Sequence, residues 1–233
     1  WHSEVSGKTD KSYHEEKHLI ALNNNIRLIQ IFEDEWLNKQ DIIKSILMNI
    51  LGNSKRIFAR KCKLININQD DAKDFLFNNH LQGPINGTNI GLYYNNELVS
   101  MITIGKSRYN KNYEYEILRF CSKQNTSVVG GFSKLLKHAI KSFGKSIITY
   151  ADARFGTGNV YKNSGFLQID KSKPNYFYLN KNHTTRQSRI KYQKHKLPNL
   201  LESFDPNLTE WENMQLNGFD RIWDCGNYVY VLQ

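Results

Sequence analysis

Apolar positions along the first fifty residues follow helical and extended patterns in turn. Residues 12–22 predict a helix, and residues 26–32 (IRLIQIF) are rich in branched side chains, which predicts a strand buried on at least one face. Apolar side chains recur at helical spacing in residues 41–51, and Gly52 is suited to end that helix. These elements bury too little surface to fold alone, so further strands are expected before Trp1.

The longer middle section predicts a mixed sheet with helices on its faces. Strands over residues 89–94 and 97–104 are joined by Asn95-Asn96, which favours a hairpin, and an amphipathic helix covers residues 130–143. The other predicted elements are a helix over residues 71–79 capped by Asp70, strands over residues 113–121, 146–150 and 176–179, and a short helix over residues 159–164. Strands followed by alternating helices and strands predict an α/β (α+β) fold.

These changes of pattern divide the chain into four parts. Residues 1–52 precede a basic segment, residues 53–63, which is interpreted as a linker or as the solvated start of the next domain. Residues 64–180 form the central domain, and residues 181–233 form a basic extension that is expected to pack on it. The extension predicts a helix capped by Thr209 and Glu212, and a hairpin of residues 221–223 and 228–232.

Charge and cysteine usage narrow the class of protein. The net charge of +10 and the pI of about 9.4 favour a polyanionic partner, the alternative being a merely basic protein. Cys62, Cys121 and Cys225 are far apart, which argues against a disulfide framework or a zinc ribbon and fits the cytoplasm.

No apolar run approaches the length of a membrane span. The chain opens at Trp1 without an initiator methionine, which indicates a fragment or a processed chain.

The first part carries a pattern that resembles a family of DNA nucleases. WHSE (residues 1–4) is followed by YHEEK (residues 13–17) and by IRLIQIFEDEW (residues 26–36). The arrangement is similar to the later half of the very-short-patch-repair nucleases, and more closely to phage homing endonucleases built on that fold. The resemblance implies that residues 1–52 form part of a restriction-endonuclease-like core, and that the complete protein hydrolyses phosphodiesters with Mg²⁺.

Two histidines are the nuclease candidates that this resemblance suggests. His2 matches the histidine of the family's Trp-His pair, and a histidine suits the base that activates water. His14 and Lys17 are weaker candidates on the following helix; taken singly, each histidine is better interpreted as a surface residue. The family's metal-binding carboxylate precedes the Trp-His pair, so the metal ligands are unknown and this chain is expected to be inactive as a nuclease. Residues 33–35 are interpreted as a solvated strand end rather than a metal site.

The middle section resembles the GNAT superfamily of acyltransferases. In VVGGFS (residues 128–133), Gly130 and Gly131 precede a helix and let backbone amides approach a pyrophosphate. NVYKNSGF (residues 159–166) is similar to the motif near the end of the superfamily's fold. The resemblance implies that Val129, Gly130, Gly131 and Ser133 bind an acyl-coenzyme A.

Within that superfamily the closer resemblance is to the phage Mom DNA-modification proteins. The matching segments are NHLQG (residues 79–83), EILRF (residues 116–120) and ITYAD (residues 148–152), with Tyr161 following. The resemblance implies that His80 or Asp152 deprotonates an amine and that Tyr161 protonates a departing thiolate. Ser127 is a weaker candidate. Each candidate also has a structural alternative. His80 could be a histidine at a helix end, Asp152 could cap the next turn, and Tyr161 could be a core tyrosine.

The extension begins with a run of basic residues that suits the phosphates of double-stranded DNA. Between residues 181 and 196 lysine and arginine alternate with His183, Tyr192 and His195, and no acidic residue intervenes. The predicted DNA contacts are Arg186, Arg189, Lys191, Lys194 and Lys196. The alternative is a solvated basic surface.

Three functional hypotheses follow. The main one is a DNA-binding fragment of a phage homing endonuclease, in which the GNAT-like domain serves to recognise DNA. The alternative is a Mom-like N-acyltransferase that modifies a DNA base with an acyl-coenzyme A donor. A plain acetyltransferase of proteins or small molecules is the third, and the basic charge and the N-terminal pattern count against it.

Overall fold

The computed structural model describes residues 2–7, 9–180 and 185–233. The chain forms two compact units, each made of segments that are discontinuous in sequence. We call them the tail unit (Trp1–Asp34, Asp152–Thr157 and Lys171–Asn227) and the sheet unit (Glu35–Ala151, Gly158–Asp170 and Tyr228–Gln233). They do not follow the linear division predicted at residues 52, 63 and 180.

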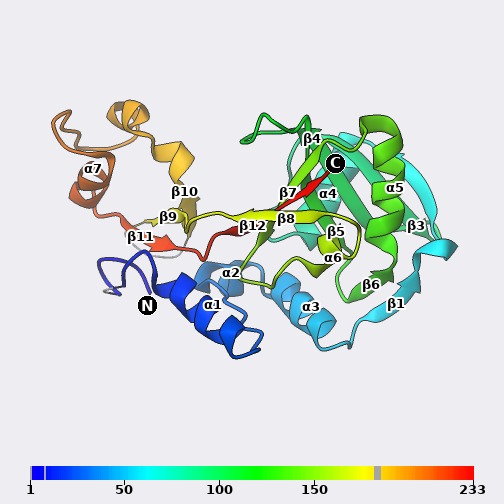
Figure 1. Cartoon of the computed structure of the whole chain (residues 1–233). Helices are drawn as coiled ribbons and strands as arrows, with labels where there is room; N and C mark the ends of the chain where they lie inside the picture. The colour runs from blue at the N-terminus through cyan, green and yellow to red at the C-terminus, as the bar shows by residue number, and fades with distance from the viewer. Residues whose placement is uncertain (1, 8, 181–184) are drawn as a thin grey trace. The chain divides into compact units, whose positions relative to one another are not determined.

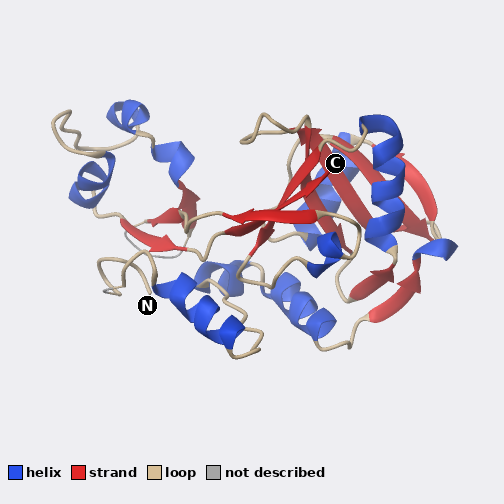
Figure 2. Ribbon diagram, viewed as in Figure 1, coloured by secondary structure: helices blue, strands red, loops and turns tan. Residues whose placement is uncertain are grey.

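A seven-stranded mixed sheet dominates the structure (Figures 1 and 2), in the strand order β2-β3-β4-β5-β7-β12-β8. Strands β2 to β5 are antiparallel to their neighbours, and β7 runs parallel to β5. The strands are β2 (Lys63–Ile67), β3 (Thr88–Tyr94), β4 (Glu97–Lys106), β5 (Tyr115–Ser122), β7 (Ile147–Asp152), β8 (Leu167–Lys171) and β12 (Asn227–Leu232). The predicted mixed sheet with flanking helices is therefore confirmed.

Local sequence explains the centre of this sheet. Asn95 and Asn96 both have positive φ, 50° and 62°, which is the backbone of the predicted tight hairpin between β3 and β4. In β4, residues 99–104 are buried without a break, as expected of a strand covered on both faces. Helix α4 (Gln69–Asn79) packs Ala72 and Leu76 against this sheet, and α5 (Gly131–Phe143) buries one apolar side in the sheet unit.

The basic segment of residues 53–63 belongs to the sheet unit. It contains β1 (Lys55–Phe58), which pairs in parallel with β6 (Thr126–Val129), and the short 3₁₀ helix η1 (Ala59–Lys61). Of the two interpretations from sequence, the structure therefore supports the start of the next domain rather than a linker.

The first fifty residues correct two sequence predictions. They form three helices, α1 (Tyr13–Asn23), α2 (Glu33–Asn38) and α3 (Gln40–Ile50), and the predicted strand of residues 26–32 is absent from this described segment. Its branched side chains do not join a ladder; instead Gln30 N–H donates to the Arg154 carbonyl at 3.1 Å, and Phe32 is buried. Without that strand, these residues contain no part of a restriction-endonuclease-like sheet.

The tail unit is built around a small antiparallel sheet in the order β10-β9-β11. The strands are β9 (Tyr176–Leu179), β10 (Arg186–Ser188) and β11 (Asp220–Trp223); the helical turns are η2 (Arg189–Tyr192), η3 (Lys194–Asn199) and α7 (Glu210–Leu216). The capping box of Thr209 and Glu212 is confirmed. The predicted hairpin of β11 with residues 228–232 is wrong, because β11 pairs with β9 while β12 joins the seven-stranded sheet.

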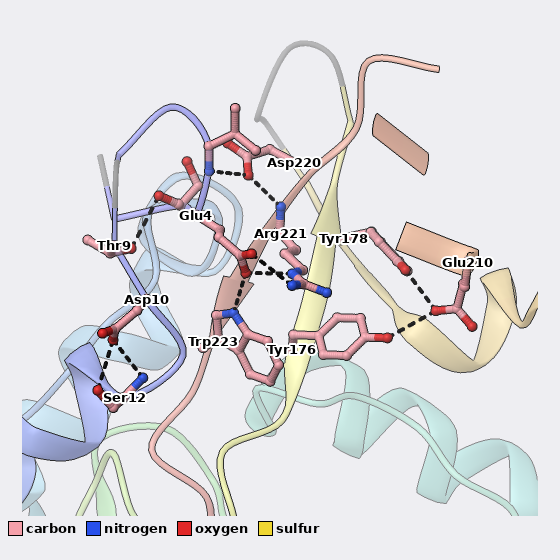
Figure 3. Close-up of polar contacts among 12 residues, drawn as sticks. Glu4, Thr9, Asp10, Ser12, Tyr176, Tyr178, Glu210, Asp220, Arg221 and Trp223 are labelled. Carbon is pink, nitrogen blue, oxygen red and sulfur yellow. Dashed lines mark hydrogen bonds and ion pairs between the residues drawn. The ribbon is translucent and has the colours of Figure 1, made fainter. Parts of the chain in front are cut away.

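The N-terminal residues are fixed to this small sheet by charge (Figure 3). Glu4 accepts hydrogen bonds from the Arg221 guanidinium at 2.5 and 2.7 Å and from the Trp223 indole at 2.7 Å. Asp220 accepts from the backbone amides of Val5 and Ser6, both at 2.9 Å. Residues 2–7 thus belong structurally with residues 171–227, and the same unit contains residues 9–34 of the predicted nuclease segment.

The short helix α6 (Asn159–Lys162) completes the sheet unit. No helix in the described part of the chain is long and apolar enough to span a membrane.

We expect Gly226→Ala to lower the free energy of unfolding by about 2–4 kcal/mol, because a left-handed conformation and a backbone clash add together. Gly226 has a φ of 76°, and an added Cβ would lie 2.1 Å from the Ser172 carbonyl oxygen. Gly52 has a similar φ of 77° but open space around it. Gly52→Ala should therefore lower the free energy of unfolding by only about 1–2 kcal/mol. Urea titrations of both variants measure the two losses, and equal losses would contradict the clash at Gly226.

Candidate functional site

Strands β5 and β7 diverge after a short parallel ladder. Three residue pairs join them, from Tyr115↔Ile147 to Ile117↔Thr149, and the ladder ends there. Beyond it, β5 still pairs with β4 on its other side. The carbonyls of β5 that face away from β4 are therefore available to other partners beyond Ile117.

A β-bulge at the divergence aims an arginine. Thr103 pairs with Arg119 but Ile104 pairs with Ile117, so Leu118 is the extra residue. Side chains alternate between faces of a strand, and the bulge shifts that alternation by one residue. The Arg119 guanidinium donates to the Leu118 carbonyl at 2.6 Å and to the Gly83 carbonyl at 3.1 Å. Arg119 lies in the segment EILRF that resembles the Mom proteins, although no role is predicted for it from the sequence.

Arg119 is a cation without a carboxylate partner within hydrogen-bond distance in the described structure. Burial, with the charge of Arg108 adding to it, lowers the pKa of Arg119 to about 10, although Glu116 acts in the opposite direction. A guanidinium remains charged at neutral pH at this value. It therefore supplies a positive field that favours an anion at the divergence of β5 and β7.

His80, the predicted base, follows α4 in the sheet unit. Its Nδ1 accepts a hydrogen bond from the Gln82 backbone amide at 3.1 Å. Burial, then the charges of Arg119 and Lys39, lower the pKa of His80 to about 3. The ring is therefore uncharged at neutral pH, and because Nδ1 accepts, Nε2 carries the proton. In this state His80 is a hydrogen-bond donor and a poor base.

The glycine turn joins β6 to α5. Gly130 has a φ of 74°, which favours glycine, and a Cβ on Gly131 would lie 3.0 Å from Val128. The first backbone amides of α5 have no partner within the helix and point along its positive end. A helix that begins in this way offers free backbone amides, which suit an anion. The predicted role of Gly130, Gly131 and Ser133 in binding a pyrophosphate stays a prediction. Val129 is the last residue of β6 and leads directly into the turn.

Tyr161 lies in an aromatic cluster that connects these features. Phe132, the second residue of α5, contacts both Phe120 of β5 and Tyr161, with ring centroids 4.9 and 5.2 Å apart. Burial raises the pKa of Tyr161, against the effect of its hydrogen bond with Thr149. Thr149 in turn donates to the Ile117 carbonyl at 3.3 Å, at the end of the β5–β7 ladder. Tyr161 thus keeps its phenolic proton at the point of divergence.

Asp152 belongs to the tail unit and is bound to Arg154. Its carboxylate accepts from the Arg154 guanidinium at 2.7 to 3.2 Å and from the Arg154 backbone amide at 3.0 Å. The guanidinium also lies 4.3 Å from the centre of the Phe32 ring. An aspartate held in this way fixes its own loop, and its predicted role as a base stays a prediction.

The nuclease candidates lie together in the tail unit without forming a metal site. The His2 and His14 rings are 5.5 Å apart, and the pKa of His2 is lowered by burial and by Lys17. Burial, and lesser effects of His2 and Lys17, lower the pKa of His14 to about 4 in spite of a bond to the Trp223 backbone. Among the described residues, no group of three or more histidine, cysteine or acidic side chains could hold a metal ion. No site for the Mg²⁺ of the nuclease hypothesis is therefore observed among the described residues.

The predicted DNA contacts divide into two kinds. Arg186 donates to Asp34 at 2.6 Å and stacks on Phe32 at 3.8 Å, so its guanidinium is part of the core of the tail unit. Arg189, Lys191 and Lys194 are exposed on η2 and η3. Lys196 is half-buried and donates to the Ile190 carbonyl at 2.9 Å. Lys181 and His183 lie outside the described residues.

Comparisons with known proteins identify one family. The model of the Mom protein family matches residues 61–219. A GNAT family acetyltransferase from Elizabethkingia anophelis, solved with acetyl-CoA bound, is 14% identical with a TM-score of 0.40, over 74% of this chain and 98% of that chain. A Bacillus subtilis acetyltransferase in complex with CoA is 14% identical with a TM-score of 0.39, over 74% and 99%. No curated protein matches the sequence.

We expect the His80 imidazole to remain uncharged down to pH 5 in an NMR titration, since its pKa is lowered to about 3. Arg119→Met should raise this pKa toward the ordinary value by removing a nearby positive charge. The control is Lys73→Met in α4, the helix that His80 follows. It removes an exposed charge that pairs with Asp70, and it should leave the His80 titration unchanged. A wild-type His80 that titrates near pH 6.5 would contradict this electrostatic description.

Proposed function

The chain belongs to the Mom protein family, and we propose that it transfers an acyl group from a coenzyme A thioester to an amino group of a base in double-stranded DNA. The observation that carries this proposal is the convergence of the glycine turn, Arg119 and Tyr161 on the divergence of β5 and β7. It corresponds to the alternative hypothesis from sequence. The main hypothesis, a homing endonuclease, has no support from the family match or from the geometry of His2 and His14.

The donor site is the turn before α5. Backbone amides of Gly131, Phe132 and Ser133 would hold the pyrophosphate of coenzyme A, which supplies the acyl thioester when bound. Gly130 is required there by its positive φ, and Gly131 by its approach to Val128. A Cβ at Gly130 would lie 3.8 Å from the Ala59 Cβ, so the positive φ rather than a clash disfavours a side chain there.

The reaction forms one bond and breaks another. The acceptor amine forms a C–N bond to the acyl carbon, the C–S bond breaks, the amine releases a proton to solvent and the thiolate takes one up. Tyr161 suits the second proton transfer, because its raised pKa keeps the phenol protonated. His80 acts as a hydrogen-bond donor through Nε2 rather than as the base that the sequence analysis expected.

Charge supports DNA as the acceptor. The chain carries a net charge of +10, and exposed cations cluster on η2 and η3 of the tail unit. Such side chains neutralise phosphates, and binding then weakens as salt rises. A cationic surface attracts a polyanion, whereas a small uncharged acceptor would gain nothing from it.

Calorimetry with acetyl-coenzyme A tests the donor site. The wild-type chain should bind the thioester, and Gly130→Glu should weaken binding at least about 100-fold, because it brings a carboxylate to a phosphate site and strains a left-handed position. Gly52→Glu makes the same change at an exposed left-handed glycine and should bind normally. If the wild-type chain takes up no thioester, the transferase proposal is wrong.

Duplex-DNA binding at several salt concentrations tests the acceptor. Replacing Arg189, Lys191 and Lys194 with glutamine should reduce the slope of log K against log salt by about 0.9 for each phosphate that is no longer neutralised. The matched control neutralises the same number of exposed lysines in the sheet unit, Lys55, Lys73 and Lys141, and should retain the slope. If the slope falls only in the control, the DNA contacts these lysines of the sheet unit, and the proposed contacts on η2 and η3 are wrong.

A further inference from the structure

The loop between β4 and β5 combines basic and aromatic side chains. Residues 106–113 read KSRYNKNY and contain no acidic residue. The loop is closed by its own hydrogen bonds: the Ser107 hydroxyl donates to the Asn110 carbonyl at 2.6 Å, and Lys111 donates to the Ser107 carbonyl at 2.6 Å. These bonds hold the intervening Tyr109 in a defined position.

Tyr109 presents an aromatic ring to solvent next to the divergence of β5 and β7. Its side chain is 64% exposed, although burying a tyrosine ring is favourable. One part of the ring meets Tyr150, with centroids 6.0 Å apart and planes at 87°. Tyr150 follows Thr149, the last residue of the β5–β7 ladder. The exposed ring is therefore anchored on β7 beside the elements that form the candidate site.

The charges around this ring favour an anion. Arg108 lies 5.1 Å from the centre of the Tyr109 ring, and its guanidinium is fixed by Glu116, which accepts from Nε at 3.2 Å and from the backbone amide at 3.1 Å. Glu116 is 1% exposed, so its charge faces Arg108 rather than solvent. Arg119 adds a second cation, electrostatically coupled to both Arg108 and Glu116. Two guanidiniums against one carboxylate leave a net positive field at the ring.

An exposed ring in a positive field suits a ligand with a flat π face and phosphates, which is the chemistry of a nucleotide. We propose that Tyr109 is a stacking platform for a nucleobase of the acceptor DNA, extruded from the duplex. This inference rests on the proposed function. An enzyme that reacts with a base takes it out of the stack, because the target atom is otherwise out of reach. The position of Tyr109 in a protruding loop, between cations, suits a long duplex better than the adenine ring of coenzyme A.

Two duplexes of equal length and charge test the platform by fluorescence anisotropy. One carries a central adenine opposite an abasic site, and the other has abasic sites on both strands. Wild-type protein should bind the first about tenfold more tightly, since stacking on an aromatic side chain is of this order and an unpaired base is cheap to extrude. Tyr109→Ala should reduce this preference to near one, and Tyr109→Phe should retain it.

A charge control separates stacking from general attraction. Lys106→Ala removes an exposed cation at the start of the loop and should weaken binding of both duplexes by the same factor, which leaves their ratio unchanged. If wild-type protein binds both duplexes equally, the platform is overturned while DNA remains the acceptor. If it binds neither, the proposed DNA acceptor fails and this inference with it. If Tyr109→Ala weakens acetyl-coenzyme A binding instead, the ring holds the donor's adenine and the inference is overturned.

Discussion

The short parallel ladder between β5 and β7 is the constraint on which the candidate site depends. A parallel pair that continued along both strands would satisfy their backbone groups with each other. Because the ladder ends at Ile117 and Thr149, the Leu118 carbonyl accepts from Arg119, and Thr149 is within hydrogen-bonding reach of Tyr161. The bulge at Leu118 changes the side to which Arg119 points. One interruption of pairing thus supplies both a positive charge and a protonated phenol.

Charge has two separate uses in this protein. In the sheet unit, the Arg119 guanidinium donates to backbone carbonyls, and its charge contributes to the lowered pKa of His80. In the tail unit, Arg154, Arg186 and Arg221 are held by carboxylates and lie over aromatic rings. Figure 3 shows the pair of Arg221 with Glu4. A guanidinium bound in this way stabilises a fold and has little capacity left for phosphate. A count of arginines therefore overestimates the number of guanidiniums that are available to bind phosphate.

The nuclease hypothesis has no support from the family match. In the tail unit, several residues of the segments that carried this resemblance have other partners. Glu4 binds Arg221, Asp34 binds Arg186, and His14 is buried with its pKa lowered to about 4. Carboxylates paired with arginine in this way contribute to the fold of the tail unit.

The sequence by itself determined what depends on neighbouring residues: the Asn95-Asn96 hairpin, the capping box of Thr209, the amphipathic α5 and the glycine turn before it. These follow from local dihedral preferences and periodicity, which a sequence records directly. Only the tertiary structure decided the rest. Residues 26–32 are mostly apolar but lie outside any strand, and β12 joins a different sheet from β11. Asp152 pairs with the nearby Arg154, and Arg186 pairs with Asp34, which is distant in sequence. Strand pairing and the protonation of His80 depend on residues that meet only after folding, so no local pattern could predict them.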